Sequence, residues 1–419
     1  MATPTQSVSA SWLLRLTFVT ALVGVAGGLS GLVITLLLHA VQHFAYGYSE
    51  GTFLEGLLGV SSWRRVVALT FAGSVGAVGW WALRKWGKPV VSITKSVAGA
   101  RMPTLATLVN AGLQIVVVGL GASIGREVAP RELGSLSADW LSHKFGVSAR
   151  ERRILVACGA GAGLAAVYNV PLGGALFAIE ILLAEVSFAT ALPALATSAI
   201  ATLIAHLVVP VTPLYRVAQS APFTSFSLLT WSVLVGPVIG FGSVGFVRLV
   251  RVAGLRRPTG WRIVAVMPVV CLAIGLLSIP YPAILGNGRS LGQIAFDATT
   301  PLAMIALLML LKVVATVGTV GSGAAGGMLT PSLAIGAAFG AVTGGLWTML
   351  WPGPATTAFA FIGAAAFLAS SMRAPMTALI LVIEFTNQGP ALLVPSMLAI
   401  AGSVLIGYLI GRRRLIGFA

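Results

Sequence analysis

The chain has 419 residues, of which 57% are hydrophobic and only 9% are charged, and its mean hydropathy is +0.98. Because a soluble globular domain carries roughly 25% charged residues, this composition excludes a fully water-facing surface and predicts a polytopic membrane protein. The net charge of +16 would suggest nucleic acid if the chain were soluble. Here, however, Lys and Arg stand in short clusters between apolar runs, as in loops that flank membrane spans, so we expect no nucleic-acid partner.

Five apolar runs predict helices in the bilayer, where about 20 apolar residues cross the hydrocarbon core. Several runs are shorter than this or are interrupted by Gly and Pro, of which the chain has 50 and 21. Backbone that leaves the helical path in a membrane must be buried in protein or line a polar cavity. Scattered glycines therefore indicate close helix packing, and clustered ones indicate broken helices. The runs are Trp12–Ala40, Val66–Leu83, Leu105–Leu120, Ile263–Ile279 and Pro301–Val320.

Cysteine and histidine usage gives no sign of a metal or cofactor site. Cys158 and Cys271 both lie in apolar surroundings, and the four histidines form no close ligand set. We therefore expect no disulfide framework, no metal and no cofactor. The first twenty residues lack a basic segment and a cleavage motif, so no removed signal peptide is expected.

The sequence contains an internal repeat. The segments GAGAGLAAVYNVPLGGALFAIE, from residue 159, and GAAAFLASSMRAPMTALILVIE, from residue 363, share a Pro (Pro171, Pro375) and a final Glu (Glu180, Glu384) at the same positions. A Gly-rich segment precedes each copy: GLGASIGREVAP at 119–130 and GSGAAGGMLTP at 321–331. A single membrane domain with repeat halves at about 12–210 and 225–411 is thus predicted. Broken helices at matching places in two halves point to a transporter binding site.

Each Gly-rich segment is followed by an early Pro, the pattern of a turn that leads into a helix. A helix that starts inside the membrane presents free backbone N–H groups and about half a positive charge. Such a terminus binds anions without a fixed cation, and the ion can leave again because no full charge holds it. If the two halves bring these termini together, they form an anion site made of amides.

Glu127 lies within the first Gly-rich segment. An intramembrane carboxylate costs roughly 2.5–3.5 kcal/mol on insertion scales and is a functional candidate for that reason. When ionised it is itself an anion and can occupy the amide site, and when protonated it is neutral and can yield the site to a transported anion. The alternative is a structural ion pair with the neighbouring Arg126. Glu180 and Glu384, being duplicated, are better explained by helix packing or capping.

These segments resemble motifs of the CLC chloride channel and transporter family. GREVA at residues 125–129 is similar to the family's GREGP, GMLTP at 327–331 to its GxFxP, and VSITK at 91–95, weakly, to its GSGIP. The resemblance runs from about Leu14 to Gly411. It implies an all-α polytopic membrane fold with two inverted structural repeats and many tilted, broken helices, assembled as a homodimer in which each subunit has its own pore. It also implies a gating and proton-accepting role for Glu127 and an anion path lined by Ser92, Arg126, Glu127, Val128, Met328 and Leu329.

Two departures from the family pattern keep the type of transport open. Ile181 stands where proton-coupled exchangers usually carry a second, internal glutamate, and Lys95 stands where GSGIP has its proline. Lys95 either raises the local anion concentration at a pore or extends to the membrane interface. The resemblance is thus compatible with chloride–proton exchange. Ile181 removes the expected internal proton station and favours the alternative of a passive anion channel, or of a carrier for another anion such as fluoride.

We also considered an intramembrane enzyme or a nucleotide-binding protein, because GSGAAGG is rich in Gly. No Lys-Ser or Lys-Thr follows this segment as a P-loop requires, and neither HExxH nor GxSxG occurs. We therefore expect a transporter in the cell membrane, the inner membrane if the source is bacterial, and not an enzyme. We expect its partners to be chloride or another small anion, protons if transport is coupled, the lipid bilayer and a second copy of the chain. We expect no cytoplasmic regulatory domain.

Overall fold

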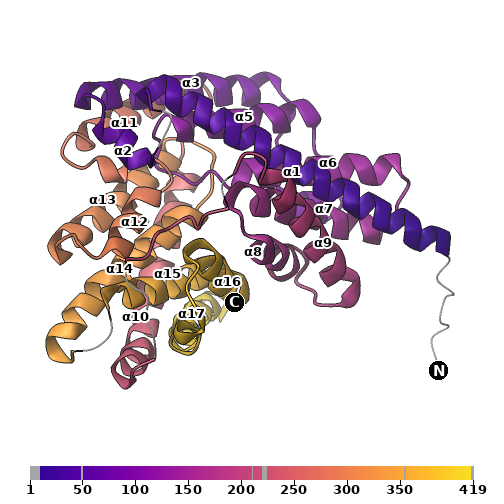
Figure 1. The fold of residues 1–419 in the computed structure, drawn as a ribbon. Helices are drawn as coiled ribbons and strands as arrows, with labels where there is room; N and C mark the ends of the chain where they lie inside the picture. The colour runs from indigo at the N-terminus through magenta and orange to yellow at the C-terminus, as the bar shows by residue number, and fades with distance from the viewer. Residues whose placement is uncertain (1–9, 49–50, 210, 219–223, 353–354, 417–419) are drawn as a thin grey trace. The chain divides into compact units, whose positions relative to one another are not determined.

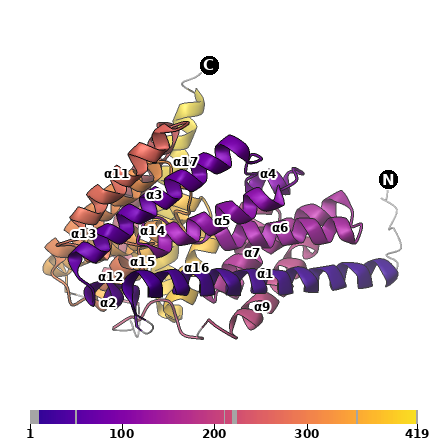
Figure 2. The same ribbon diagram turned by 90° about the horizontal axis from the view of Figure 1, so that it is seen from above.

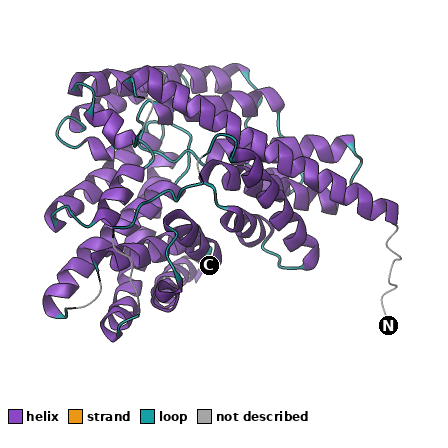
Figure 3. Ribbon diagram, in the orientation of Figure 1, coloured by secondary structure: helices purple, strands orange, loops and turns teal. Residues whose placement is uncertain are grey.

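The computed structural model describes residues 10–48, 51–209, 211–218, 224–352 and 355–416. Within these residues the backbone forms α-helices, one π-helix and two 3-10 helices, with no strand (Figures 1 and 3). The all-α prediction is confirmed. In chain order the elements are α1 (Ala10–Tyr46), α2 (Phe53–Leu58), α3 (Ser62–Trp86), α4 (Ile93–Val97), α5 (Thr104–Gly119), α6 (Val128–Lys144), α7 (Ala149–Tyr168), α8 (Pro171–Leu176), η1 (Phe177–Leu183), α9 (Phe188–Ala205), α10 (Phe226–Leu255), α11 (Arg262–Leu277), η2 (Pro282–Ile284), α12 (Arg289–Asp297), α13 (Leu302–Gly321), α14 (Leu329–Leu350), α15 (Thr356–Met372), α16 (Pro375–Thr386), η3 (Pro390–Leu392) and α17 (Leu393–Ile416).

Seven helices in the described part of the chain are long and apolar enough to cross a membrane. The five predicted apolar runs lie in α1, α3, α5, α11 and α13, and none of them extends more than two residues beyond the end of its helix. Figure 2 shows α1 as one continuous helix despite the glycines in its middle. The candidate spans are Leu13–Tyr46, Ser62–Trp86, Phe188–Ala205, Phe226–Leu255, Leu302–Gly321, Leu329–Leu350 and Pro390–Gly411.

The chain folds into two compact units that interleave along the sequence. The first takes its described residues from 1–33, 90–107 and 130–209, and the second from 34–89, 108–129 and 210–419. This division differs from the predicted halves, 12–210 and 225–411, because the segments 34–89 and 108–129 pack with the C-terminal part of the chain. The inverted-repeat halves therefore remain a prediction.

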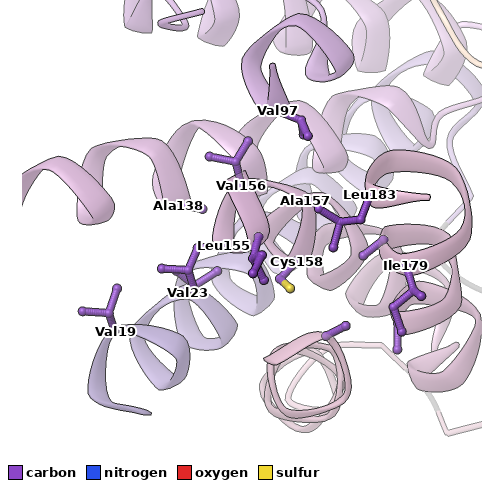
Figure 4. Packing of buried hydrophobic residues seen from close by; sticks show 14 of the residues in the cluster. Val19, Val23, Val97, Ala138, Leu155, Val156, Ala157, Cys158, Ile179 and Leu183 are labelled. Atoms are coloured by element: carbon purple, nitrogen blue, oxygen red, sulfur yellow. The ribbon is translucent and has the colours of Figure 1, made fainter. Parts of the chain in front are cut away.

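Small residues bring the helices of the first unit together. A side chain at Gly27 or Gly31 of α1 would collide with Ala162 or Ala166 of α7. Pairs of small residues four apart let membrane helices approach closely. Next to this contact, Val19 and Val23 of α1 belong to an apolar cluster with residues of α4, α6, α7 and η1 (Figure 4). Close packing, as the sequence predicted, accounts for these glycines.

The second unit is held by three extensive helix pairs: α3 with α11, α10 with α17, and α14 with α15. α3 and α11 lie side by side in both ribbon views (Figures 1 and 2). At the α14–α15 contact, a side chain at Gly336 or Gly340 would meet the backbone of Gly363. This close contact holds the middle of α14, the helix whose first turn carries the candidate site.

Candidate functional site

The two Gly-rich segments meet in the second unit. The N–H of Gly125 donates to the carbonyl of Gly327 (2.7 Å), and the N–H of Gly327 donates to the carbonyl of Gly125 (2.9 Å). This antiparallel pair is an isolated β-bridge, and helices follow at once on both sides, α6 from Val128 and α14 from Leu329. Two helix starts that are remote in sequence are thereby tied to each other through their backbones.

Glu127 reaches from one helix start to the other. Its side chain is 0% exposed, and its Oε1 accepts a hydrogen bond from the N–H of Leu329, the first residue of α14 (2.7 Å). A longer contact joins Oε2 to the hydroxyl of Thr330 (3.4 Å). Since the first N–H groups of a helix have no partner within it, the carboxylate occupies a position suited to an anion.

The glycines of the bridge leave room for this carboxylate. A methyl group added to Gly125 or to Gly327 would overlap the carboxyl group of Glu127. Both glycines are buried, so the surrounding backbone has little room to move away from an added methyl group. Glycine is therefore required at both positions if the Glu127 side chain is to keep this place. The sequence pattern alone does not reveal this requirement.

Further hydrogen bonds fix the loop that carries the first Gly-rich segment. The hydroxyl of Tyr46 donates to the carbonyl of Leu120 (2.7 Å), close to the end of α5. The hydroxyls of Ser123 and Thr316 lie 3.1 Å apart and connect this loop to α13. Such buried polar contacts hold the backbone near Glu127 in one arrangement.

The structure brings together some of the predicted site residues. Arg126, Val128 and Met328 are half-buried next to the bridge, and Leu329 is buried. Ser92 and Lys95, by contrast, belong to the first unit. There Ser92 is the N-cap of the five-residue helix α4, its hydroxyl accepting from the N–H of Lys95 (3.4 Å), and both residues are exposed.

The repeated glutamates differ in their local backbone. Glu180 lies in η1, a seven-residue π-helix, whereas Glu384 lies in the regular helix α16. A π-helix is rare and often marks a functional position, and no sequence signal predicted it here. Ile181, which departs from the family pattern, lies in the same π-helix. In the described part of the chain, no group of three or more His, Cys, Asp or Glu side chains is placed to hold a metal ion.

Sequence reasoning passed over two polar residues near the site. One is Thr330, directly after the amide that binds Glu127. The other is Lys312, fully buried in α13, whose Nζ donates to the carbonyls of Ile284 (2.9 Å) and Gly286 (2.6 Å). A lysine in the middle of an apolar run was the available signal, because ionisable residues within membrane helices are rare.

Comparison with known proteins places this geometry in a family. The family model for voltage-gated chloride channels matches residues 72–408. The chain is 29% identical over 403 residues to a ClcB-like chloride channel protein of Ralstonia nicotianae, covering 91% of each chain. It is 28% identical over 369 residues to the voltage-gated ClC-type chloride channel ClcB of Shigella flexneri, covering 84% of this chain and 86% of that one.

Solved structures agree in fold. The fold is similar to that of a slow cyanobacterial Cl−/H+ antiporter (TM-score 0.81, 20% identity, 95% of each chain). It is also similar to that of a CLC-type fluoride/proton antiporter (TM-score 0.73, 20% identity, 96% of each chain). The matched residues 72–408 include both Gly-rich segments and Glu127, so the resemblance drawn from the motifs is confirmed. The chain belongs to the voltage-gated chloride channel (CLC) family.

Proposed function

We propose that the protein carries small anions, chloride first among them, across a membrane along a path lined by backbone amides, and that Glu127 is the gate of this path. One observation carries the proposal: the buried carboxylate of Glu127 accepts from the N–H of Leu329. A carboxylate at the unpartnered end of a helix occupies the place that a mobile anion would take. Gate and anion then compete for the same donors.

The chemistry of gating follows from the charge of the side chain. An ionised Glu127 carries the same charge as the transported ion and binds the same amide. Protonation removes that charge, weakens the hydrogen bond with Leu329 and lets the side chain leave its seat. The proton that arrives on the carboxylate is therefore linked to the arrival of an anion on the amides. Arg126, Val128 and Met328, which adjoin the bridge, would line the same path.

Transport without stoichiometric proton movement is the second candidate. Ile181 cannot accept a proton, so the internal station that exchangers of this family usually carry as a glutamate is missing. This favours a channel or an uncoupled carrier, for chloride or for another small anion such as fluoride. Among the similar solved structures, one is that of a Cl−/H+ antiporter and another is that of a fluoride/proton antiporter.

We propose a bacterial inner membrane as the location of the protein and a homodimer as its assembly. With seven helices of spanning length in its described part and bacterial relatives, the chain is proposed to lie in a bacterial inner membrane as a homodimer with one pore in each subunit. Light scattering on the detergent-solubilised protein, corrected for bound detergent, measures the mass of the assembly. A mass of one chain would contradict the dimer.

The proposed function is tested by reconstitution into liposomes, with chloride efflux and proton uptake recorded together. We expect Glu127→Gln, which mimics the protonated gate, to abolish proton movement and to make chloride flux independent of pH. Glu384→Gln is the matched control, an acid-to-amide change on α16, and should leave the pH dependence of flux unaltered. Proton-coupled flux that persists in Glu127→Gln would refute the role of Glu127. Absence of chloride and fluoride flux in the wild type would refute transport of these ions.

A further inference from the structure

Lys312 stands out among the buried side chains of the second unit. It lies in the middle of α13 with 0% of its surface exposed. Within the described part of the chain its ammonium forms no ion pair, and its contacts are the carbonyls of Ile284 and Gly286. Removing an ammonium from water without a countercharge is costly, and two neutral carbonyls offset only part of that cost.

The lysine lies close to the start of α14. A methyl group placed on Gly288 would be 3.4 Å from Cε of Lys312 and 3.4 Å from Cα of Pro331. These two atoms are therefore no more than about 7 Å apart. Pro331 is in the first turn of α14, two residues after Leu329, whose N–H holds Glu127. The side chain thus runs beside the helix start at which we propose that anions bind.

The same helix face is connected to the loop before Glu127. Thr316, one turn after Lys312, has its hydroxyl 3.1 Å from that of Ser123. The carbonyl of Gly286 accepts from Lys312, while the N–H of Gly286 donates to the carbonyl of Gly121 (2.8 Å). The ammonium is therefore linked through Gly286 to the first Gly-rich segment, and the lysine side chain lies close to Pro331 at the end of the second.

The helices that precede the two Gly-rich segments, α5 and α13, differ at the position that corresponds to Lys312. The first of them carries no cation there. Lys312 precedes Gly327 by 15 residues, and Asn110 of α5 precedes Gly125 by 15 residues. Asn110 is buried and neutral, and its Oδ1 accepts from the indole N–H of Trp80 (3.0 Å). An uncharged polar side chain fills this place in the first half, so packing alone does not explain a lysine in the second.

We propose that Lys312 is the fixed countercharge of the anion site. The two carbonyls hold its ammonium in place, so that it attracts an anion to the amides of α14 through space without binding the anion directly. This inference rests on the proposed function and adds to it a determinant of anion affinity. A unit charge about 10 Å away in a medium of effective dielectric constant about 20 changes a binding constant roughly tenfold.

The test is the chloride dissociation constant, measured by calorimetric titration on purified protein in detergent. Lys312→Met removes the charge and keeps most of the length of the side chain, and we expect it to weaken chloride binding roughly tenfold. Lys312→Gln removes the charge and keeps N–H donors for the two carbonyls, and it carries the same expectation if the Met variant fails to fold. Lys312→Arg keeps the charge and should bind chloride within about twofold of the wild type. Neutral variants that fold and bind chloride as the wild type does would overturn the proposal.

A control at a second buried cation shows whether weaker chloride binding comes from the lost charge or from a disturbed structure. Arg65 of α3 is also buried and donates to two carbonyls, those of Leu57 (2.9 Å) and Ile279 (3.2 Å). Arg65→Met should lower the melting temperature and leave the chloride dissociation constant unchanged. If it weakens chloride binding as much as Lys312→Met does, the effect is structural and the proposal is wrong.

The same titration distinguishes failure of this inference from failure of the proposed function. A wild-type protein that neither binds nor transports chloride or fluoride contradicts the proposed function itself. A wild type that binds chloride with an affinity insensitive to the charge at position 312 contradicts only the role of Lys312.

Discussion

Gly327→Ala would open the gate without altering the carboxylate. The new methyl group would lie on the carboxyl group of Glu127, which is the far end of a flexible side chain. Rotation of Glu127 is the cheapest way to remove that overlap, because the backbone at residue 327 is fixed by its two hydrogen bonds with Gly125. We therefore expect the carboxylate to leave its seat while the amide of Leu329 stays in place.

The structure gives the magnitude of this effect. In its seat, Glu127 accepts a short, charge-assisted hydrogen bond from the N–H of Leu329 (2.7 Å). A hydrogen bond to a charged group contributes about 1.5–3 kcal/mol, so its loss shifts the equilibrium between the seated and the open side chain by roughly 10- to 100-fold. Chloride flux at neutral pH should rise toward the level that the wild type reaches in acid.

The assay is chloride efflux from liposomes across a range of pH. Gly112→Ala is a matched control, because a methyl group at this position of α5 meets no atom within 4 Å. It should leave the pH profile of the wild type unchanged, whereas Gly327→Ala should flatten it. If Gly327→Ala folds, retains its melting temperature and keeps the wild-type pH dependence, Glu127 in this seat does not control the flux.

Three further changes test other parts of the structure. Lys95→Ala should lower anion flux at low ionic strength and have no effect at high salt, where exposed charges are screened; equal flux of both proteins at every salt concentration would contradict an electrostatic role. Gly161→Ala would put a methyl group against the carbonyl oxygen of Gly174 and should reduce stability by about 1–3 kcal/mol through overpacking, seen as a lower melting temperature in detergent; an unchanged melting temperature would show that the close α7–α8 contact adjusts without cost. Tyr46→Phe removes the hydroxyl that donates to the carbonyl of Leu120 and should lower the free energy of unfolding by about 1–3 kcal/mol. The melting temperature in detergent measures this loss as well.

The two helix starts at the candidate site were predictable from the sequence. Glycines followed by an early Pro indicated helix starts near Gly125 and Gly327, and α6 and α14 begin three and two residues after them. Glu127 was a clear candidate because it is an acidic residue within a Gly-rich segment between apolar runs. These features are local, since turn chemistry and helix propensity act over a few residues, and the repeat made them visible twice.

The contacts of the site were beyond prediction because they join remote parts of the chain. Nothing in the local pattern says that Gly125 pairs with Gly327, or that Glu127 accepts from the first residue of α14. Lys312 was visible as a charge in an apolar run, but its place beside Pro331 depends on the tertiary packing of α12, α13 and α14. The π-helix around Glu180 likewise has no single-sequence signature.

The bridge between Gly125 and Gly327 bears on how a gate of this kind moves. Because the backbones of the two helix starts are bonded to each other, opening does not require them to separate. In the mechanism that we propose, the moving part is the side chain of Glu127, and its release would break the bond with Leu329 and leave the amide free for an anion. A gate that is a single side chain responds to its own protonation, so pH dependence needs no second domain. Proton coupling requires in addition a route from Glu127 to the opposite side, and since Ile181 offers no proton acceptor, that route would have to run through other groups or through water.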